Sequence, residues 1–268
     1  MNHVTSKDET SIAYDRLGSG PAVVLVGGAA VDRSENAPLA AELAAHFTTY
    51  NYDRRGRGDS GDTAPYALER EIEDIAAMIA AAGGSAHLYG LSSGGALVLE
   101  AAAAGVAADR IAVYEVPYNV APDAEERHRR YVDGLAEHLA DGRRGDAFAH
   151  FMRTVGSPDH VIESVRTSPA WARCEAIAPT LLYDAACLGD GRPPVDRLAT
   201  ISQPTLVATG GASADTPVGG ATMGFFDAPA DAIAAAVPTA ERHVVEGQTH
   251  RADPKVMAGV LGRFFTAG

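Results

Sequence analysis

One five-residue stretch has the spacing of glycine and serine that surrounds a catalytic serine in some enzymes. The stretch 90–94, Gly-Leu-Ser-Ser-Gly, lies between a strand-like run that ends at Leu91 and a helix-like run that begins at Ser93. A serine on such a sharp turn has a strained backbone, so the residues two positions away must lack side chains. The turn would lift the hydroxyl out of a sheet and direct backbone N–H groups at an incoming carbonyl. The pattern therefore predicts that Ser92 is a nucleophile.

A serine hydroxyl is a weak nucleophile until a histidine accepts its proton. The chain has nine histidines, and His250 stands out because the loop 247–250 follows a predicted strand and precedes the last predicted helix. A loop at the carboxyl end of a late strand can reach a turn on a central strand. We therefore expect His250 to be the base, and we expect His243, within the strand, to pack or to face solvent.

Strand and helix patterns alternate in a way that predicts the elements around these residues. We expect strands at 3–7, 11–16, 21–26, 48–53, 85–91, 110–116, 204–208 and 243–246. We expect helices at 36–47, 67–82, 93–104, 230–237 and 254–265, and helical spacing without a clear strand from 117 to 199. The alternation predicts an α/β fold with a mostly parallel sheet.

Composition narrows the class of protein. With 268 residues, 46% of them hydrophobic, the chain can bury one large core. Its 22 basic and 35 acidic side chains give a net charge of −13, which disfavours binding to nucleic acid or to an anionic membrane. No apolar run approaches 18 residues and no secretory signal begins the chain, so we expect no membrane span and a cytoplasmic protein. Two cysteines, Cys174 and Cys187, predict neither a disulfide scaffold nor a zinc pair.

The chain resembles the α/β-hydrolase superfamily over nearly its whole length. The resemblance rests on the motif at 90–94, the glycine turn after 23–26, the stretch Asp-Arg-Arg-Gly-Arg-Gly-Asp-Ser at 53–60 and the late His250, in the family's order. It implies the α/β-hydrolase fold, with an eight-stranded sheet flanked by helices. It also implies a core domain of residues 1–116 and 200–268, a helical cap at 117–199 and a Ser–acid–His triad.

The resemblance further implies an oxyanion hole made of two backbone N–H groups. Here these would belong to Gly28, in the early glycine loop, and to Ser93, after the nucleophile. The family often has His-Gly in that loop, whereas this chain has Val26-Gly27. The backbone donor is retained, but the hydrogen bonding around it must differ.

The acid of the triad has two candidates. In most of the superfamily it follows the strand that corresponds to 204–208, where the usual spacing holds Ser213 and Asp215 comes late. Glu115 ends an apolar strand, where an ionised carboxylate is costly unless a group such as the catalytic histidine pairs with it. The zearalenone lactonases, which this chain also resembles locally, have a glutamate acid at that place. We favour Glu115 and keep Asp215 as the alternative.

The same local resemblance extends to the segment 169–173, Pro-Ala-Trp-Ala-Arg, whose tryptophan contacts substrate in those lactonases. It implies that Trp171 is a substrate contact. We expect Gly27 and Tyr118 to be further substrate-binding residues.

A second glycine motif, Gly-x-Gly-x-x-Gly at 56–61, matches dinucleotide-binding loops. Such a site needs the third glycine to open a helix, whereas 62–65 reads as a loop, so we interpret the motif as a turn. The chain also lacks a Gly-Lys phosphate loop, an H-E-x-x-H motif and a Cys/His cluster. We therefore expect neither a cofactor nor a metal.

Together these residues predict a serine hydrolase that cleaves a small-molecule carboxylic ester or lactone through an acyl-enzyme. Two alternatives stay open. One is a specialised relative, namely a macrolactone hydrolase, a carbon–carbon bond hydrolase or a perhydrolase. The other is a non-catalytic small-molecule binder on the same fold. The oligomeric state stays open between a monomer and a homodimer.

Overall fold

The structure, a computed structural model, describes residues 1–212 and 224–267. Within them, eight strands form one sheet in the order β1-β2-β4-β3-β5-β6-β7-β8. β2 pairs antiparallel with β1 and β4, and every other pair is parallel. This confirms the predicted mostly parallel eight-stranded sheet. The strands are β1 (Asn2–Thr5), β2 (Ser11–Gly18), β3 (Ala22–Val26), β4 (Thr48–Tyr52), β5 (Ala86–Leu91), β6 (Ala108–Tyr114), β7 (Thr205–Gly211) and β8 (Ala240–Glu246).

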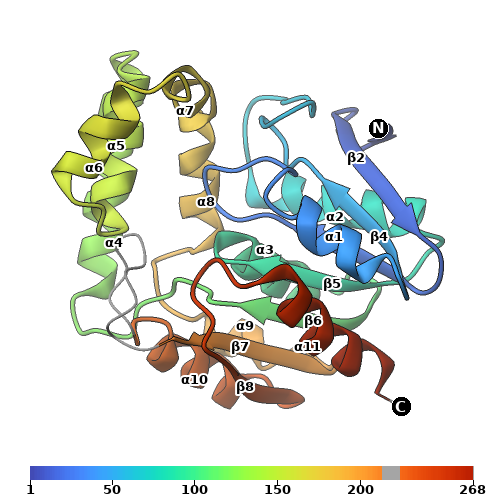
Figure 1. The fold of residues 1–268 in the computed structure, drawn as a ribbon. Helices are drawn as coiled ribbons and strands as arrows, with labels where there is room; N and C mark the ends of the chain where they lie inside the picture. The colour runs from blue at the N-terminus through green and yellow to red at the C-terminus, as the bar shows by residue number, and fades with distance from the viewer. Residues whose placement is uncertain (213–223, 268) are drawn as a thin grey trace.

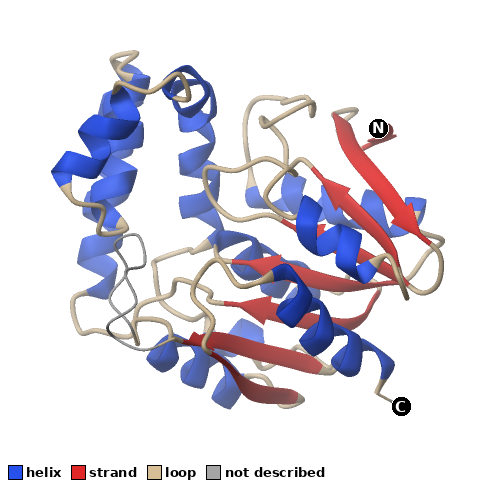
Figure 2. Cartoon of the chain, in the orientation of Figure 1, coloured by secondary structure: helices blue, strands red, loops and turns tan. Residues whose placement is uncertain are grey.

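Helices cover both faces of the sheet (Figures 1 and 2). They are α1 (Ala37–Leu43), α2 (Leu68–Ala81), α3 (Ser93–Ala103), α10 (Asp227–Ala236) and α11 (Pro254–Thr266). Side chains alternate across β3, in which residues 23–26 are buried. Val24 and Val26 join the cluster under α2, α3 and α10, whereas Val23 and Leu25 join the cluster under α1 and α11. A strand buried on both faces reads as a continuous apolar run, which is why β3 was predictable.

The residues between β6 and β7 form a group of helices beside the sheet (Figure 1). They are α4 (Ala124–Ala140), α5 (Arg144–Thr154), α6 (Asp159–Arg166), α7 (Trp171–Ile177), the 3₁₀ turn Ala178–Thr180, α8 (Leu181–Cys187) and α9 (Val195–Leu198). We call residues 117–199 the helical segment. It has its own apolar cluster, and Ala30, in the loop after β3, packs against that cluster. The helical segment therefore contacts the loop that carries Gly28.

Several element ends differ from the prediction. β7 continues through Gly210 and Gly211 because both pair with β8, although two glycines normally mark the end of a strand. The helix expected at 36–47 ends at Leu43. No helix in the described ranges is long and apolar enough to cross a membrane.

Candidate active site

Ser92 lies on a strained turn between β5 and α3. Its φ and ψ are 56° and −127°, a conformation that costs a non-glycine residue about 1–3 kcal/mol. Its N–H donates to Tyr114 O at 2.9 Å, which ties the turn to β6. A Cβ at Gly90 would lie 2.5 Å from Gly94 O, and a Cβ at Gly94 would lie 2.6 Å from Val26 O. The two glycines are therefore required because backbone atoms occupy the places of their side chains.

Glu115 directly follows β6 and also has a positive φ, 50°. Its side chain is buried, and each carboxylate oxygen has a partner. Oε1 accepts from the N–H of Gly210 at 2.8 Å, and Oε2 accepts from His250 Nδ1 at 2.7 Å. Because an ionised carboxylate only accepts hydrogen bonds, this contact requires the proton on Nδ1, and a neutral imidazole then keeps its lone pair on Nε2. That is the form in which a histidine acts as a base.

His250 is held by the loop between β8 and α11. Tyr114 Oη donates to Thr249 O at 2.6 Å, so this loop is fixed to β6 beside Glu115. Burial, and secondarily the charge of Glu115, raise the pKa of Tyr114, which keeps its hydroxyl protonated as a donor. The imidazole stacks on Phe226, with ring centroids 5.1 Å apart and an interplanar angle of 8°. The ring is thus oriented by a carboxylate at one edge and by an aromatic face.

The parallel strands bring these residues to one edge of the sheet. Ser92, Glu115 and His250 follow the carboxyl ends of β5, β6 and β8, and Gly28 follows β3, the other neighbour of β5. Within the described residues, His250 is hydrogen-bonded to Glu115 and not to Ser92 Oγ. Catalytic hydrogen bonds often form or shorten only when a substrate binds, so the absence of this bond does not exclude His250 as the base for Ser92.

The two predicted oxyanion donors belong to residues next to the nucleophile. A Cβ placed on Gly28 would lie 3.7 Å from Ser92 Oγ, so this backbone closely approaches the hydroxyl. Ser93 is the first residue of α3, where N–H groups have no partner within the helix. Neither N–H donates to another residue in the part of the chain that the structure describes. Both can therefore bind an oxygen that develops negative charge next to Ser92.

Trp171 packs inside the helical segment. Its ring meets Phe148 edge to face with centroids 5.8 Å apart, and the Arg166 guanidinium lies 5.3 Å from the ring centroid. The ring is partly exposed and belongs to the cluster that contacts Ala30. It is therefore placed on the helical side of the glycine loop.

The other residues predicted from the sequence are Gly27, Tyr118 and Asp215. Gly27 is buried, and its carbonyl fills the space that a side chain at Gly94 would need. Tyr118 is fully buried, and its hydroxyl has no hydrogen-bond partner within residues 1–212 and 224–267. Asp215 lies outside the described residues. The stacking of Phe226 on His250 was not predicted, because no local pattern links two segments that meet only in the fold.

The glycine stretch 56–61 forms a turn. The N–H of Gly56 donates to Gly61 O at 2.9 Å, and the next helix, α2, begins only at Leu68. The turn wraps around the side chain of Asp53, which occupies the place of a Cβ at Gly58 and binds the N–H of Asp59 at 2.8 Å. A carboxylate in that position would repel a pyrophosphate. In the described ranges, no group of three or more His, Cys, Asp or Glu side chains is arranged to hold a metal ion.

Known proteins match the chain over most of its length. The sequence profile of the alpha/beta hydrolase family matches residues 23–260. A protein of Xanthomonas campestris pv. campestris named pimeloyl-[acyl-carrier protein] methyl ester esterase is 32% identical over 246 residues, which are 88% of this chain and 90% of that protein. The crystal structure of an alpha/beta hydrolase from Sphaerobacter thermophilus DSM 20745 is 48% identical, with a TM-score of 0.84 over 99% of this chain and 100% of that chain. The enol-lactonase from Burkholderia xenovorans LB400, at 21% identity, shares the fold with a TM-score of 0.67 over 99% of this chain and 100% of that chain.

Proposed function

Because this chain belongs to the alpha/beta hydrolase family, we propose that it hydrolyses a carboxylic ester or lactone through an acyl-enzyme. In this proposal Ser92 is the nucleophile, His250 the base and Glu115 the acid of the triad. The N–H groups of Gly28 and Ser93 bind the oxyanion.

The reaction proceeds in two halves. Ser92 Oγ attacks the carbonyl carbon while His250 Nε2 takes the hydroxyl proton, and the carbonyl oxygen becomes an oxyanion between the two N–H groups. The tetrahedral intermediate collapses, and His250 returns the proton to the departing alcohol. Water then attacks the acyl-enzyme with His250 again as base, which releases the acid and restores Ser92. The charge of Glu115 stabilises the imidazolium in both halves.

The observation that carries the proposal is the 2.7 Å contact of His250 Nδ1 with Glu115 Oε2. It gives the histidine the tautomer that a base for Ser92 requires. A buried carboxylate is costly unless it is paired, and Glu115 finds its partners in this histidine and in a backbone N–H. The pairing favours Glu115 over Asp215 as the acid.

We also propose that the helical segment acts as a cap that selects the substrate. The helical segment packs on the glycine loop through Ala30, and its cluster includes Trp171 and three other aromatic side chains: Tyr131, Phe148 and Phe151. We expect these side chains to favour an apolar acyl or alcohol group in the substrate. The Xanthomonas relative is named as a methyl ester esterase, which supports ester cleavage, and the enol-lactonase of the same fold makes a lactone the second candidate substrate. The resemblance to zearalenone lactonases stays a prediction.

The test is intact-mass labelling with a fluorophosphonate probe. We expect one adduct on the wild type, none on Ser92→Ala, and a strongly slowed reaction for Glu115→Gln but not for Asp215→Asn. Slow labelling of Asp215→Asn alone would move the acid to Asp215. A correctly folded wild type that forms no adduct and turns over no ester would contradict the proposal and favour a non-catalytic binder.

A further inference from the structure

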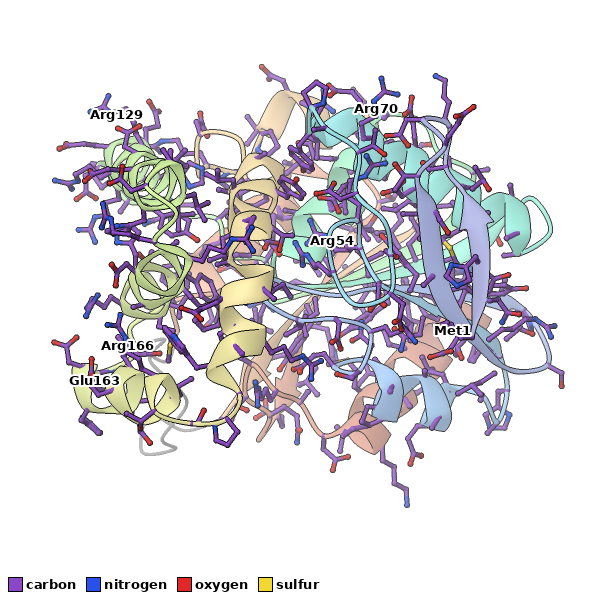
Figure 3. The ribbon with its side chains drawn as sticks, turned by 90° about the horizontal axis from the view of Figure 1, so that it is seen from above. Met1, Arg54, Arg70, Arg129, Glu163 and Arg166 are labelled. Carbon is purple, nitrogen blue, oxygen red and sulfur yellow. The ribbon has the colours of Figure 1, made fainter. Side chains whose placement is uncertain are left out.

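A cluster of buried charges lies next to the two proposed oxyanion donors. Arg54 and Arg57 follow β4, Glu71 belongs to α2, and Asp184 belongs to α8; each of the four residues is at most 3% exposed. Figure 3 shows Arg54 in the interior beside the helices of 171–187, whereas Arg129 and Arg166 lie at the periphery. Buried ion pairs contribute little net stability compared with apolar side chains of similar volume. The cluster therefore calls for an explanation beyond stability.

Glu71 fixes Arg54 within this cluster. Its two carboxylate oxygens accept from Arg54 Nε and Nη2, each at 2.7 Å. Burial alone would raise the pKa of Glu71, but the Arg54 guanidinium holds that pKa below its usual value. Glu71 is therefore ionised, and Arg54 Nη1 is left to bind the groups on its other side.

One oxygen of Asp184 collects three donors from the surroundings of the site. Asp184 Oδ1 accepts from Ser93 Oγ at 2.7 Å, from Arg54 Nη1 at 2.7 Å and from Arg57 Nη2 at 2.9 Å. Oδ2 has no partner within the described residues. Asp184 thus anchors the side chain of the residue whose own N–H is one proposed oxyanion donor.

Arg54 and Arg57 connect Asp184 to the other proposed oxyanion donor, the N–H of Gly28. Arg57 Nη1 donates to Gly28 O at 2.7 Å, and Arg54 Nη1 lies 3.4 Å from Gly27 O. Gly27 C=O and Gly28 N–H belong to one planar peptide unit, so a group that holds the carbonyl also sets the direction of the N–H. Both proposed oxyanion donors are therefore connected to Asp184 through at most one intervening side chain.

We propose that Asp184 is a positioning residue that holds both N–H groups of the oxyanion hole in place from the helical segment. It acts through Ser93, Arg54 and Arg57 and does not contact substrate. This inference rests on the proposed function, because it assumes that Gly28 and Ser93 bind an oxyanion. Its chemical role is preorganisation, since donors that are fixed before the reaction need no rearrangement as charge develops.

The test compares Asp184→Ala and Asp184→Asn with a matched control, Asp74→Asn. Asp74 is equally buried and binds Arg55 through both oxygens, at 2.7 and 2.8 Å. Among the described residues, neither Asp74 nor Arg55 is hydrogen-bonded to the glycine loop or to Ser93. In Asp184→Asn, the amide oxygen can accept the hydrogen bonds that Oδ1 accepts in the wild type. The amide nitrogen then takes the place of Oδ2, which has no partner within the described residues.

Hydrolysis of p-nitrophenyl butyrate gives kcat and KM, with active sites counted by a fluorophosphonate. Inhibition by a trifluoromethyl ketone, whose adduct with Ser92 places an oxyanion in the hole, reports the transition-state geometry. We expect Asp184→Ala to lower kcat about 10- to 100-fold with little change in KM. The affinity for the trifluoromethyl ketone should fall by a similar factor. Asp184→Asn should recover part of this loss, and Asp74→Asn should lower Tm while it keeps wild-type kcat and ketone affinity.

Ser93→Ala keeps the proposal testable if the Asp184 variants do not fold. This change retains the backbone donor but removes the hydroxyl bound to Asp184, and loss of one hydrogen bond predicts a fall in kcat of about 3- to 10-fold. Unchanged kcat in Ser93→Ala, or in folded Asp184→Ala, overturns the inference, as do equal losses in Asp184→Asn and Asp74→Asn. If Ser92→Ala retains turnover, the proposed function itself fails; if only the Asp184 and Ser93 variants behave as wild type, the inference alone fails.

Discussion

The substitution Glu115→Gln tests the site most sharply, because it changes hydrogen-bond donors and acceptors with almost no change in shape. The carboxylate accepts at both oxygens, from Gly210 N–H at 2.8 Å and from His250 Nδ1 at 2.7 Å. A glutamine has one acceptor and one NH₂ donor. If its oxygen keeps the Gly210 bond, its NH₂ meets Nδ1, and the imidazole must place its proton on Nε2. If the amide is turned round, two donors face each other at Gly210.

Either arrangement predicts a large kinetic effect and a modest loss of stability. The first arrangement removes the lone pair that accepts the Ser92 proton, and both remove the negative charge that stabilises the imidazolium. We expect kcat/KM to fall by about 10³- to 10⁴-fold, as for an acid-to-amide change in a serine triad. The buried mismatch should destabilise the fold by about 1–3 kcal/mol.

The assay is hydrolysis of p-nitrophenyl butyrate together with the rate of fluorophosphonate labelling, normalised to folded protein by near-ultraviolet circular dichroism. Asp215→Asn is the matched control, since it neutralises the alternative acid. Glu115→Gln with more than one tenth of wild-type kcat/KM would refute the assignment of Glu115. A loss confined to Asp215→Asn would show that Glu115 holds the histidine only structurally.

Three further predictions concern the turn, the core and the helical segment. Gly94→Ala should destabilise the protein by more than about 3 kcal/mol, because the new methyl group meets backbone oxygens including Gly27 O, and a wild-type Tm would contradict this. Burial lowers the pKa of His87 below its ordinary 6.5, so the unfolded chain takes up a proton first and stability is lost as the pH falls below that value. The His87 ring stacks on Phe265, so a phenyl ring can take its place. The Tm of His87→Phe should therefore fall less between pH 7 and pH 5 than the Tm of the wild type. Parallel curves of Tm against pH would refute this origin of the pH dependence. Trp171→Ala should raise KM several-fold with kcat nearly unchanged, as expected for uniform binding, whereas a lowered Tm with unchanged KM would restrict Trp171 to packing.

The sheet and the turn at Ser92 were predictable because their signals are local. An apolar run such as 22–26 reports burial on both faces, and the glycines at 90 and 94 report backbone contacts that no side chain could share. The same reasoning predicted His250 from its place after a strand. Glu115 was predicted from the cost of an unpaired carboxylate at the end of an apolar strand and from the resemblance to zearalenone lactonases. Parallel strands bring such positions to one edge whatever the loops between them contain.

The contacts inside the helical segment and below the glycine loop were not predictable in this way. α7, α8 and α9 are seven, seven and four residues long, too short for a helical period to stand out. The bond from Arg54 to Asp184 joins residues 130 positions apart. The spacing of charges along the chain does not predict such a pair. Sequence patterns report which side chains are buried, but they do not report which partners buried charges find.

The end of β7 contributes a hydrogen bond to the residue that follows β6. Its Gly210 N–H binds Glu115 Oε1, so β7 contributes a backbone donor that fixes a carboxylate carried by β6. His250 has one Nδ1, and Glu115 Oε2 already binds it at 2.7 Å. A second carboxylate at the same nitrogen would have to displace the first or be protonated, because two like charges at one site raise the pKa of one of them. The two candidate acids therefore exclude each other at this nitrogen. Gly210 has no side chain to compete for the space that Tyr114 Oη and Gln248 O occupy, and its N–H is the donor that binds Glu115.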